Sequence, residues 1–204
     1  MAVTLIDMGA GNLHSVANAL KAAGAGDISI TADAGEVVRA DRIVLPGVGA
    51  FAACAAALRA IPGMIAALDQ RVLRDGAPFL GICVGMQLLA RVGEEFGEHP
   101  GLGWFDGRVT RLTPADLEAR VPHMGWNDVV PVGDHPLIVP GEAYFLHSYG
   151  YVGDSSDRGV IATTGHGGPV TAAIGRDNIL GVQFHPEKSQ RYGIALMERF
   201  LSWR

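Results

Sequence analysis

The sequence predicts one α/β domain over residues 1–204, with a mainly parallel central sheet, helices on both faces and an antiparallel extension. Three observations lead to this prediction. In the first half, short apolar runs alternate with helix-like segments, as in a doubly wound sheet. In the second half, short strand-like runs follow one another directly, which is typical of antiparallel or mixed pairing. The 204 residues are 49% hydrophobic and show no repeat or linker, which favours a single core.

The first half contains the strands expected to be parallel, each a short apolar run that ends at a turn signal. They are Ala2–Ile6, Ile28–Thr31, Arg42–Leu45 and Pro78–Ile82. Residues 12–23 follow the first strand and carry apolar side chains at helical spacing. Two alanine-rich helices are expected at residues 51–60 and from about Pro62, because proline is favoured in the first turn of a helix.

The second half contains the strands expected to extend the sheet, separated by turn residues. They are Gly107–Leu112, Trp126–Val132, Tyr144–Tyr151, Val160–Thr164, Pro169–Ile174 and Ile179–Phe184. An amphipathic helix is predicted at residues 190–203, where the apolar side chains recur at helical spacing. The segment 113–122 has no strand or helix pattern, and no role is assigned to it.

Composition excludes several classes of protein. The net charge is −5 and no run of Lys or Arg stands out, which argues against binding to nucleic acid or to an anionic membrane. The N-terminal segment Ala2–Asp7 lacks the basic region of a signal peptide, and no segment approaches the roughly 20 apolar residues of a membrane span. The only cysteines are Cys54 and Cys83, so a disulfide framework is not expected and a cytoplasmic location is predicted.

The pentapeptide Gly81–Gly85 has Cys83 at its centre and joins an apolar run to a helix-like run, Met86–Ala90. This is the pattern of a sharp strand-to-helix turn that exposes a nucleophile. The glycines are required because a Cβ would clash in so tight a turn. The N-terminus of a following helix favours a thiolate, which is the reactive form. The alternative is that Cys83 is simply a small buried hydrophobic residue.

A base and an acid follow the last strand-like run, at His185 and Glu187. Residues i and i+2 of an extended segment face the same side, and Pro186 between them is expected to keep the segment out of a helix. Strand ends on the carboxyl side of such a sheet bind ligands, so the two side chains could meet Cys83 there. A thiol, a histidine and a carboxylate form a nucleophilic triad. The alternative is a structural histidine beside a surface acid.

Two backbone donors are expected to bind an oxyanion. One is the N–H of Val84, by the geometry of the turn, and the other comes from the glycine-rich loop Pro46–Gly49. That loop alone could also be an ordinary strand-to-helix turn. No metal or organic cofactor is predicted, because the seven histidines show no ligand spacing with the two cysteines. Cys54 lies in an alanine-rich helix and is expected to be buried and unreactive.

Taken together, these motifs resemble the class I (triad) glutamine amidotransferases, whose fold is flavodoxin-like. Within that class they are similar to the glutaminase subunits of imidazole glycerol phosphate synthases. The resemblance covers residues 3 to about 202 and is carried by short segments spread along the chain. These are Asp7–Asn12, Pro46–Phe51, Gly81–Gln87, His123–Asn127, Tyr144–Tyr149 and His185–Ser189.

The resemblance implies a role for each matching residue. Cys83 would form a γ-glutamyl thioester and release ammonia, with His185 as base and acid and Glu187 as its orienting partner. The oxyanion would be bound by Val84 and by the peptide between Val48 and Gly49, the latter after a rearrangement in some states. Glutamine would be held by residues lining its pocket: Gln87, Glu95, His147, Ser148 and Tyr149. The neighbouring Glu94 leaves the assignment of Glu95 open.

The resemblance also implies a partner. Ammonia would pass to a cyclase subunit, a (β/α)8 barrel that makes imidazole glycerol phosphate and an aminoimidazole carboxamide ribotide in histidine biosynthesis. Since this chain ends at Arg204 without a barrel, a heterodimer is expected. Four residues would face the cyclase or gate the ammonia route: Asn12, Met124, Trp126 and Lys188. For Trp126 the alternative is an ordinary core position.

Two other functions remain to be compared with a partner-dependent glutaminase. One is a free-standing amidase or cysteine peptidase with the same triad, against which the Pro46–Gly49 loop argues. The other is a non-catalytic α/β binding module with a vestigial turn, against which the presence of Cys83, His185 and Glu187 argues.

Overall fold

A mixed sheet runs through the computed structural model, which describes residues 2–116, 118–153 and 159–203. Among these residues its strand order is β2-β1-β3-β4-β13-β12-β11-β8-β9. The strands of its first part are parallel: β2 (Asp27–Thr31), β1 (Ala2–Ile6), β3 (Arg42–Gly47), β4 (Phe79–Cys83) and β13 (Ile179–Val182). The alternating pattern predicts the first four, whereas Ile179–Phe184, expected in the antiparallel extension, instead pairs with β4 in parallel. Their carboxyl ends therefore lie along one edge, where a ligand site is expected.

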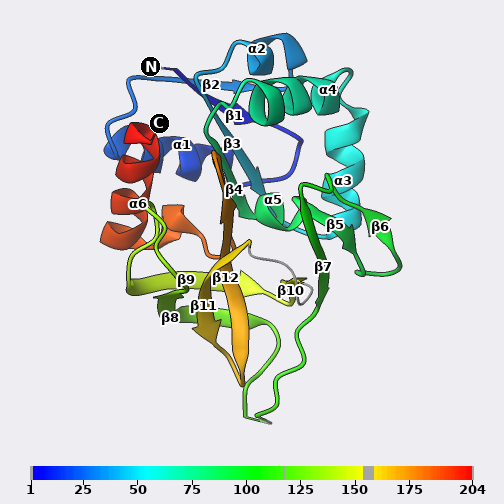
Figure 1. Cartoon of the computed structure of the whole chain (residues 1–204), viewed down its shortest axis with the longest axis vertical. Helices are drawn as coiled ribbons and strands as arrows, with labels where there is room; N and C mark the ends of the chain where they lie inside the picture. The colour runs from blue at the N-terminus through cyan, green and yellow to red at the C-terminus, as the bar shows by residue number, and fades with distance from the viewer. Residues whose placement is uncertain (1, 117, 154–158, 204) are drawn as a thin grey trace.

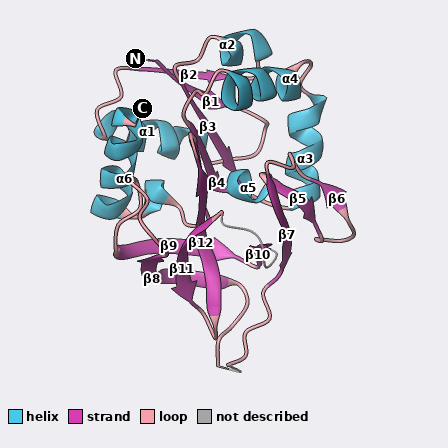
Figure 2. Cartoon of the chain, viewed as in Figure 1, coloured by secondary structure: helices cyan, strands magenta, loops and turns pink. Residues whose placement is uncertain are grey.

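The second part of the sheet is antiparallel and confirms the predicted extension. It contains β12 (Pro169–Arg176), β11 (Val160–Gly165), β8 (His123–Pro131) and β9 (Gly141–His147). A separate sheet lies beside it, formed by β10 (Tyr149–Gly153), β7 (Phe105–Arg111), β5 (Ala90–Gly93) and β6 (His99–Pro100). The strand predicted at Gly107–Leu112 therefore does not extend the main sheet, because it pairs with β10 and β5 instead. Figure 2 shows that the lower part of the molecule is built from strands and loops, while the helices gather around the parallel strands.

The helices cover both faces of the parallel strands, as Figure 1 shows. On one side lie α1 (Leu13–Ala22) and α6 (Gln190–Ser202), which contact each other. On the other lie α3 (Phe51–Ala60) and α4 (Met64–Leu68), the latter continued by a π-helical segment, Asp69–Arg74. The short α2 (Ala34–Val38) packs on α4. This arrangement is the predicted flavodoxin-like α/β fold.

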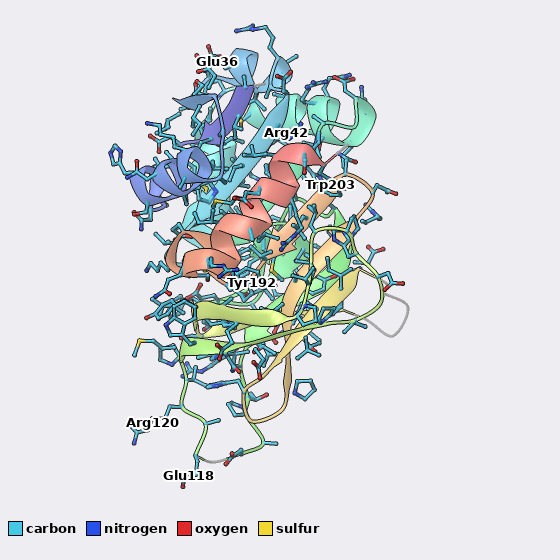
Figure 3. All side chains as sticks on the ribbon, turned by 90° about the vertical axis from the view of Figure 1, so that its left-hand side faces the viewer. Glu36, Arg42, Glu118, Arg120, Tyr192 and Trp203 are labelled. Atoms are coloured by element: carbon cyan, nitrogen blue, oxygen red, sulfur yellow. The ribbon has the colours of Figure 1, made fainter. Side chains whose placement is uncertain are left out.

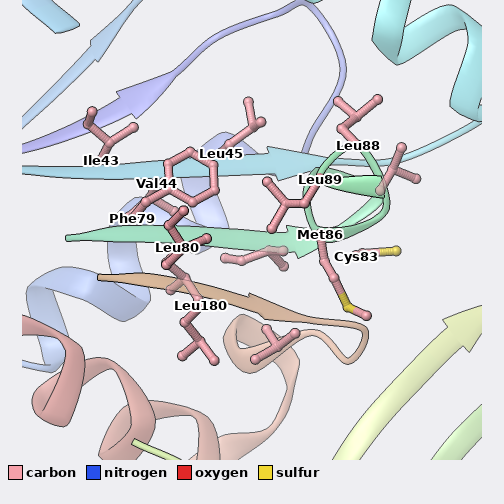
Figure 4. Close-up of a cluster of buried hydrophobic side chains, with 14 of the residues drawn as sticks. Ile43, Val44, Leu45, Phe79, Leu80, Cys83, Met86, Leu88, Leu89 and Leu180 are labelled. Carbon is pink, nitrogen blue, oxygen red and sulfur yellow. The ribbon is translucent and has the colours of Figure 1, made fainter. Parts of the chain in front are cut away.

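The core includes β3 and β4, which are buried along their whole length. Figure 4 shows the side chains of Ile43 to Leu45, Phe79, Leu80 and Leu180 interleaved between neighbouring strands, with Cys83 at the end of this layer. A strand buried on both faces reads as a continuous apolar run, which is why the Pro78–Ile82 segment was recognisable in the sequence.

The C-terminal helix is anchored to the first residue of β3. The guanidinium of Arg42 is buried and donates through Nε to the carbonyl of Phe200, at 3.1 Å, and through Nη2 to that of Trp203. Figure 3 shows Arg42 near the C-terminal end of α6 and Tyr192 near its start. A cation that binds the last carbonyls of a helix stabilises its C-terminus.

Three local predictions were wrong. The helix-like run Met86–Ala90 is helical only in α5 (Val84–Gln87), and Ala90 begins β5, since pairing with Phe105 outweighs the local preference. The predicted strand Tyr144–Tyr151 is divided at Ser148 between two sheets, as β9 and β10. Pro186 begins a 3₁₀ turn, Pro186–Lys188, instead of keeping the segment extended, because proline fits the first position of a helical turn.

Among the described residues, no single helix is long and apolar enough to cross a membrane. Phe51–Ala60 and Met64–Arg74 reach that length and hydropathy only when joined across a 90° bend.

Candidate active site

Cys83 occupies a strained turn at the end of β4. Its φ of 54° and ψ of −111° lie in a region that residues with a side chain rarely adopt, and such strain clusters at functional sites. A Cβ on Gly85 would lie 1.8 Å from the carbonyl oxygen of Leu45, and one on Gly81 would lie 2.7 Å from that of Gly85. The steric reason predicted for the two glycines is therefore confirmed.

The helix after Cys83 is shorter than the sequence indicates. With four residues, α5 is a single turn and carries little macrodipole. The expectation that a helix N-terminus activates the thiol is thus only weakly supported, and stronger partners must come from neighbouring side chains.

His185 and Glu187 meet across the 3₁₀ turn. The Nδ1 of His185 lies 2.9 Å from Oε1 of Glu187, and both side chains are almost fully buried. The backbone of His185 is held on both sides, because its N–H donates to the carbonyl of Tyr144 at 2.9 Å and its carbonyl accepts from Ser189 Oγ at 2.6 Å. These contacts fix the imidazole relative to the sheet.

Cys83 lies near enough to His185 to shift the pKa of the imidazole, which brings the predicted trio together. Because Nδ1 is bonded to the carboxylate, Nε2 is the nitrogen left for the thiol. Burial alone lowers the pKa of His185, but its interactions with Cys83 and Glu187 outweigh that effect and raise the pKa to about 9. The site therefore holds a proton on the imidazole at neutral pH, beside the sulfur.

A cavity of about 310 Å³ opens over these residues. It brings together nearly every residue that the sequence predicted for catalysis and glutamine binding: Val48, Gly49, Cys83, Val84, Gln87, Glu95, His147, Ser148, Tyr149 and His185. Lys188, predicted for the partner interface, lies at the same cavity. Glu187 stands behind His185. Pro122 and Leu146 also line the cavity and were not predicted, because nothing in their local pattern marks them.

Gln87 and Gln183 form a buried pair beside the thiol. Nε2 of Gln87 donates to the carbonyl of Tyr149 at 2.9 Å and to Oε1 of Gln183 at 3.0 Å. Nε2 of Gln183 in turn lies 3.7 Å from Sγ of Cys83. Gln183 was not predicted, although it stands two residues before His185 and extended chains place such residues on one side.

The structure separates Glu95 from Glu94. Glu95 lines the cavity, and its Oε2 accepts from the backbone N–H of Phe51, at 2.8 Å. Glu94 forms an ion pair with Arg108 at the surface. Of the two carboxylates, only Glu95 therefore faces the cavity.

The Pro46–Gly49 loop packs tightly against the turn at Cys83. A Cβ on Gly47 would lie 2.8 Å from the backbone nitrogen of Gly85, and Gly49 has a φ of +96° that favours glycine. The carbonyl of Val48 accepts a hydrogen bond from Cys54 Sγ at 3.3 Å. Cys54 is buried as predicted, and burial raises the pKa of its thiol to about 11, which keeps it protonated.

The four residues predicted to face a partner or gate are exposed at the surface. Met124 is 65% exposed and Trp126 is 48% exposed, so the core interpretation of Trp126 is wrong. Trp126 packs edge-on against Tyr144, and Nζ of Lys188 lies 5.8 Å from the same ring. Asn12 is exposed just before α1. Within the described part of the chain, no three His, Cys, Asp or Glu residues form a group able to hold a metal ion.

Comparison with known proteins agrees with this geometry. The glutamine amidotransferase class I family model matches residues 4–202. The chain is 61% identical to the imidazole glycerol phosphate synthase subunit HisH of Zymomonas mobilis, over 98% of this chain and 95% of that protein. It is 50% identical to the HisH subunit of Ruegeria pomeroyi, over 100% and 99% of the two chains.

Solved structures share the fold at low identity. The crystal structure of a glutamine amidotransferase matches with a TM-score of 0.73 and 19% identity, over 98% of this chain and 97% of that chain. A glutamine amidotransferase from Thermotoga maritima matches with a TM-score of 0.62 and 17% identity, over 99% and 83%. Since the family model spans almost the whole sequence and the relatives match it end to end, the chain belongs to the class I glutamine amidotransferases.

Proposed function

We propose that the chain is the glutaminase subunit of imidazole glycerol phosphate synthase, which hydrolyses glutamine to glutamate and ammonia for histidine biosynthesis. The observation that carries the proposal is the linked set Cys83, His185 and Glu187 at the wall of a cavity of about 310 Å³. The 61% identity to the Zymomonas mobilis HisH subunit supports the choice of synthase.

In the first half of the reaction, Sγ of Cys83 attacks the side-chain amide carbon of glutamine. The C–N bond breaks, and the proton on Nε2 of His185 passes to the leaving nitrogen, which departs as ammonia. The product on the enzyme is a γ-glutamyl thioester. Glu187 keeps Nδ1 of His185 protonated through its 2.9 Å hydrogen bond, so that Nε2 is the nitrogen that exchanges protons.

In the second half, water attacks the thioester. Nε2 of His185 takes a proton from that water and returns it to sulfur as the C–S bond breaks, which releases glutamate and regenerates Cys83. The sum is glutamine and water giving glutamate and ammonia. The mechanism needs a free thiol, and both Cys83 and Cys54 are free cysteines, consistent with the cytoplasmic location we propose.

The oxyanion of each tetrahedral intermediate would be bound by backbone donors. The Val84 N–H follows the nucleophile directly, and the peptide between Val48 and Gly49 borders the same cavity. Donors fixed in place before the reaction act strongly because no reorganisation is needed as charge develops.

The amino-acid end of glutamine would be held on the opposite side of the cavity. The Glu95 carboxylate suits the substrate's ammonium, and the positions of His147, Ser148 and Tyr149 on the cavity wall suit recognition of the rest. Gln87 has both amide hydrogens engaged by protein groups, so only its Oε1 remains for substrate.

The partner would be the cyclase subunit, which we propose to be a (β/α)8 barrel bound as a heterodimer. The exposed side chains of Met124 and Trp126 form an apolar surface of the kind that marks an interface. Lys188 lines the cavity and also lies beside the ring of Tyr144, which Trp126 contacts. We therefore propose that ammonia passes Lys188 on its way from the cavity to the surface formed by Met124 and Trp126. Asn12 would complete the contact.

The test is glutamate release by the purified chain, alone and with the cyclase subunit and its nucleotide ligand. We expect low activity alone and a rise of tenfold or more in the complex. The variant Cys83→Ala should lose glutamate release but still bind the cyclase. Glutaminase activity that survives in that variant would remove Cys83 as the nucleophile. Full activity without the cyclase would favour a free-standing amidase instead.

A further inference from the structure

A continuous line of hydrogen bonds joins a backbone carbonyl to the sulfur of Cys83. It begins at the carbonyl oxygen of Tyr149, passes through the side-chain amides of Gln87 and Gln183 and ends at Sγ. The donor–acceptor distances are 2.9, 3.0 and 3.7 Å in that order. Gln87 is 4% exposed and Gln183 is 0% exposed, so water does not compete for these groups.

The carbonyl of Tyr149 determines which groups donate and which accept along this series of hydrogen bonds. A carbonyl oxygen can only accept, so Gln87 must turn its NH₂ toward Tyr149. The second hydrogen of that NH₂ then points to Gln183, which must offer its oxygen. Once Oε1 of Gln183 is engaged in this way, its NH₂ is the group left to face the sulfur. The carbonyl of Tyr149 therefore determines, through two amides, that Cys83 meets a donor.

A second hydrogen bond strengthens the first step. The carbonyl of Tyr149 also accepts from Nδ1 of His147, at 2.9 Å, so both of its lone pairs are used. His147 is itself buried, and its Nε2 is bonded to Nδ1 of His123. The carbonyl cannot rotate away without breaking contacts from two elements, which fixes the orientation of both glutamines.

We propose that Gln183 is a further catalytic residue, whose amide N–H stabilises the thiolate form of Cys83, and that Gln87 and the Tyr149 carbonyl are positioning groups that hold it as a donor. A neutral amide has an advantage over a second cation here. It binds the sulfur anion without titrating, and it remains in place when His185 gives up its proton to the departing nitrogen.

Gln183 is not the only polar side chain near the sulfur of Cys83. The titratable or charged side chains that share the cavity are Glu95, His147, Tyr149, His185 and Lys188. His185 interacts with the sulfur, and Glu187 is hydrogen-bonded to that histidine at 2.9 Å. Gln183 contributes in addition to this pair, so its removal should shift thiolate formation without abolishing it.

The test measures thiolate directly and needs no glutaminase assay. The rate of alkylation of Cys83 by iodoacetamide is followed from pH 5 to 10 in the full-length chain, with Cys83→Ala as the blank for Cys54. In Gln183→Leu the apparent pKa of the alkylation rate plotted against pH should rise by about one. At pH values below that apparent pKa, alkylation should therefore be about tenfold slower than in the parent chain. In Gln183→Glu, which keeps the shape but places an acceptor at the sulfur, the rise should be larger.

A matched control separates this effect from loss of a buried polar group. Thr164→Val on β11 removes a buried hydroxyl that has no partner among the described residues, and it should leave the profile unchanged. Gln87→Leu removes the hydrogen bond that holds the Gln183 amide in one orientation. It should raise the apparent pKa of the alkylation profile less than Gln183→Leu does. If Gln183→Leu does not fold, Gln183→Met, an unbranched side chain of similar length, replaces it.

The proposal predicts a distinct kinetic signature in the complex with the cyclase. Gln183→Leu should lower kcat for glutamate release about tenfold with little change in KM, since the group contacts sulfur and not the substrate. The proposal would be overturned if the folded Gln183→Leu and Gln183→Glu variants gave alkylation profiles that superimpose on the parent profile. The inference rests on Cys83 as nucleophile, but the two fail differently: Cys83→Ala tests the proposed function, and the alkylation profile tests Gln183.

Discussion

Nδ1 of His123 lies 3.1 Å from Nε2 of His147, and both imidazoles are buried. Nδ1 of His147 faces the carbonyl of Tyr149, which can only accept, so His147 carries its proton there and His123 donates to it. Burial, and secondarily the neighbouring histidines, lower the pKa of His123 to about 3, while burial is the main cause that lowers the pKa of His147 to about 4. The pair is thus neutral in the folded chain.

This pair makes stability fall in mild acid. Both folded pKa values lie below the unfolded value near 6.5, so the unfolded chain binds more protons between about pH 6.5 and 4. The free energy of unfolding should therefore drop by roughly 2 kcal/mol per histidine between pH 6.5 and 4.5. The thermal midpoint measured across this range should fall less steeply in His123→Phe. Parallel curves for the two proteins would contradict the assignment.

Glu187→Gln should separate the roles of the carboxylate and the imidazole. The amide keeps the size of the side chain but removes a charge that raises the pKa of His185, so the pKa should fall below about 9. Glutamate release in the complex should drop on the order of a hundredfold, because the imidazole loses its orienting partner. Glu198→Gln on the exposed face of α6 is the control and should leave the pH–rate profile unchanged.

Gly85→Ala should prevent folding of the turn at Cys83. The added methyl would lie 1.8 Å from the carbonyl oxygen of Leu45, a distance no side chain can occupy, and β3 cannot move because it is buried on both sides. We expect a loss of more than about 3 kcal/mol in the free energy of unfolding, measured in urea. Gly26→Ala, where a Cβ meets no atom within 4 Å, should change stability little. A stable Gly85→Ala protein would show that the turn is looser than described.

Trp126→Ala should weaken binding of the cyclase subunit. The side chain is 48% exposed, so its removal should leave the thermal midpoint within a few degrees while the dissociation constant rises at least tenfold. Val152→Ala on β10, at 51% exposure, removes a comparable exposed apolar group from another sheet and should not affect binding. Equal affinities for Trp126→Ala and the parent chain would place the interface elsewhere.

The features that sequence predicted best are those whose cause is local. The glycines at 81 and 85 are required by a turn of five residues, and the strand before them is recognisable because both of its faces are apolar. The features that it missed depend on distant pairing. Ala90 begins a strand because it pairs with Phe105, and the residues next to Ala90 in the sequence do not predict this pairing.

The candidate site shows the same division. Cys83, His185 and Glu187 could be found because each has a motif of its own. Gln183 could not be assigned a role, because its donor is directed at sulfur only through Gln87 and a carbonyl 62 residues further along the chain from Gln87. The choice between Glu94 and Glu95 likewise required Arg108 and the N–H of Phe51 to be in place.

The hairpin of β8 and β9 keeps two sets of side chains apart by alternation. Met124, Trp126 and Leu146 point outward, while His123, Phe145 and His147 point inward. Outward positions can therefore be exchanged to fit a different partner surface while the inward ones stay constant. A one-residue insertion or deletion between His123 and Trp126 in β8 would turn the residues on one side of it to the opposite face, so that either the imidazole would face solvent or the indole would face the interior. The length of this hairpin, more than its surface composition, is what an engineered exchange of partners must preserve.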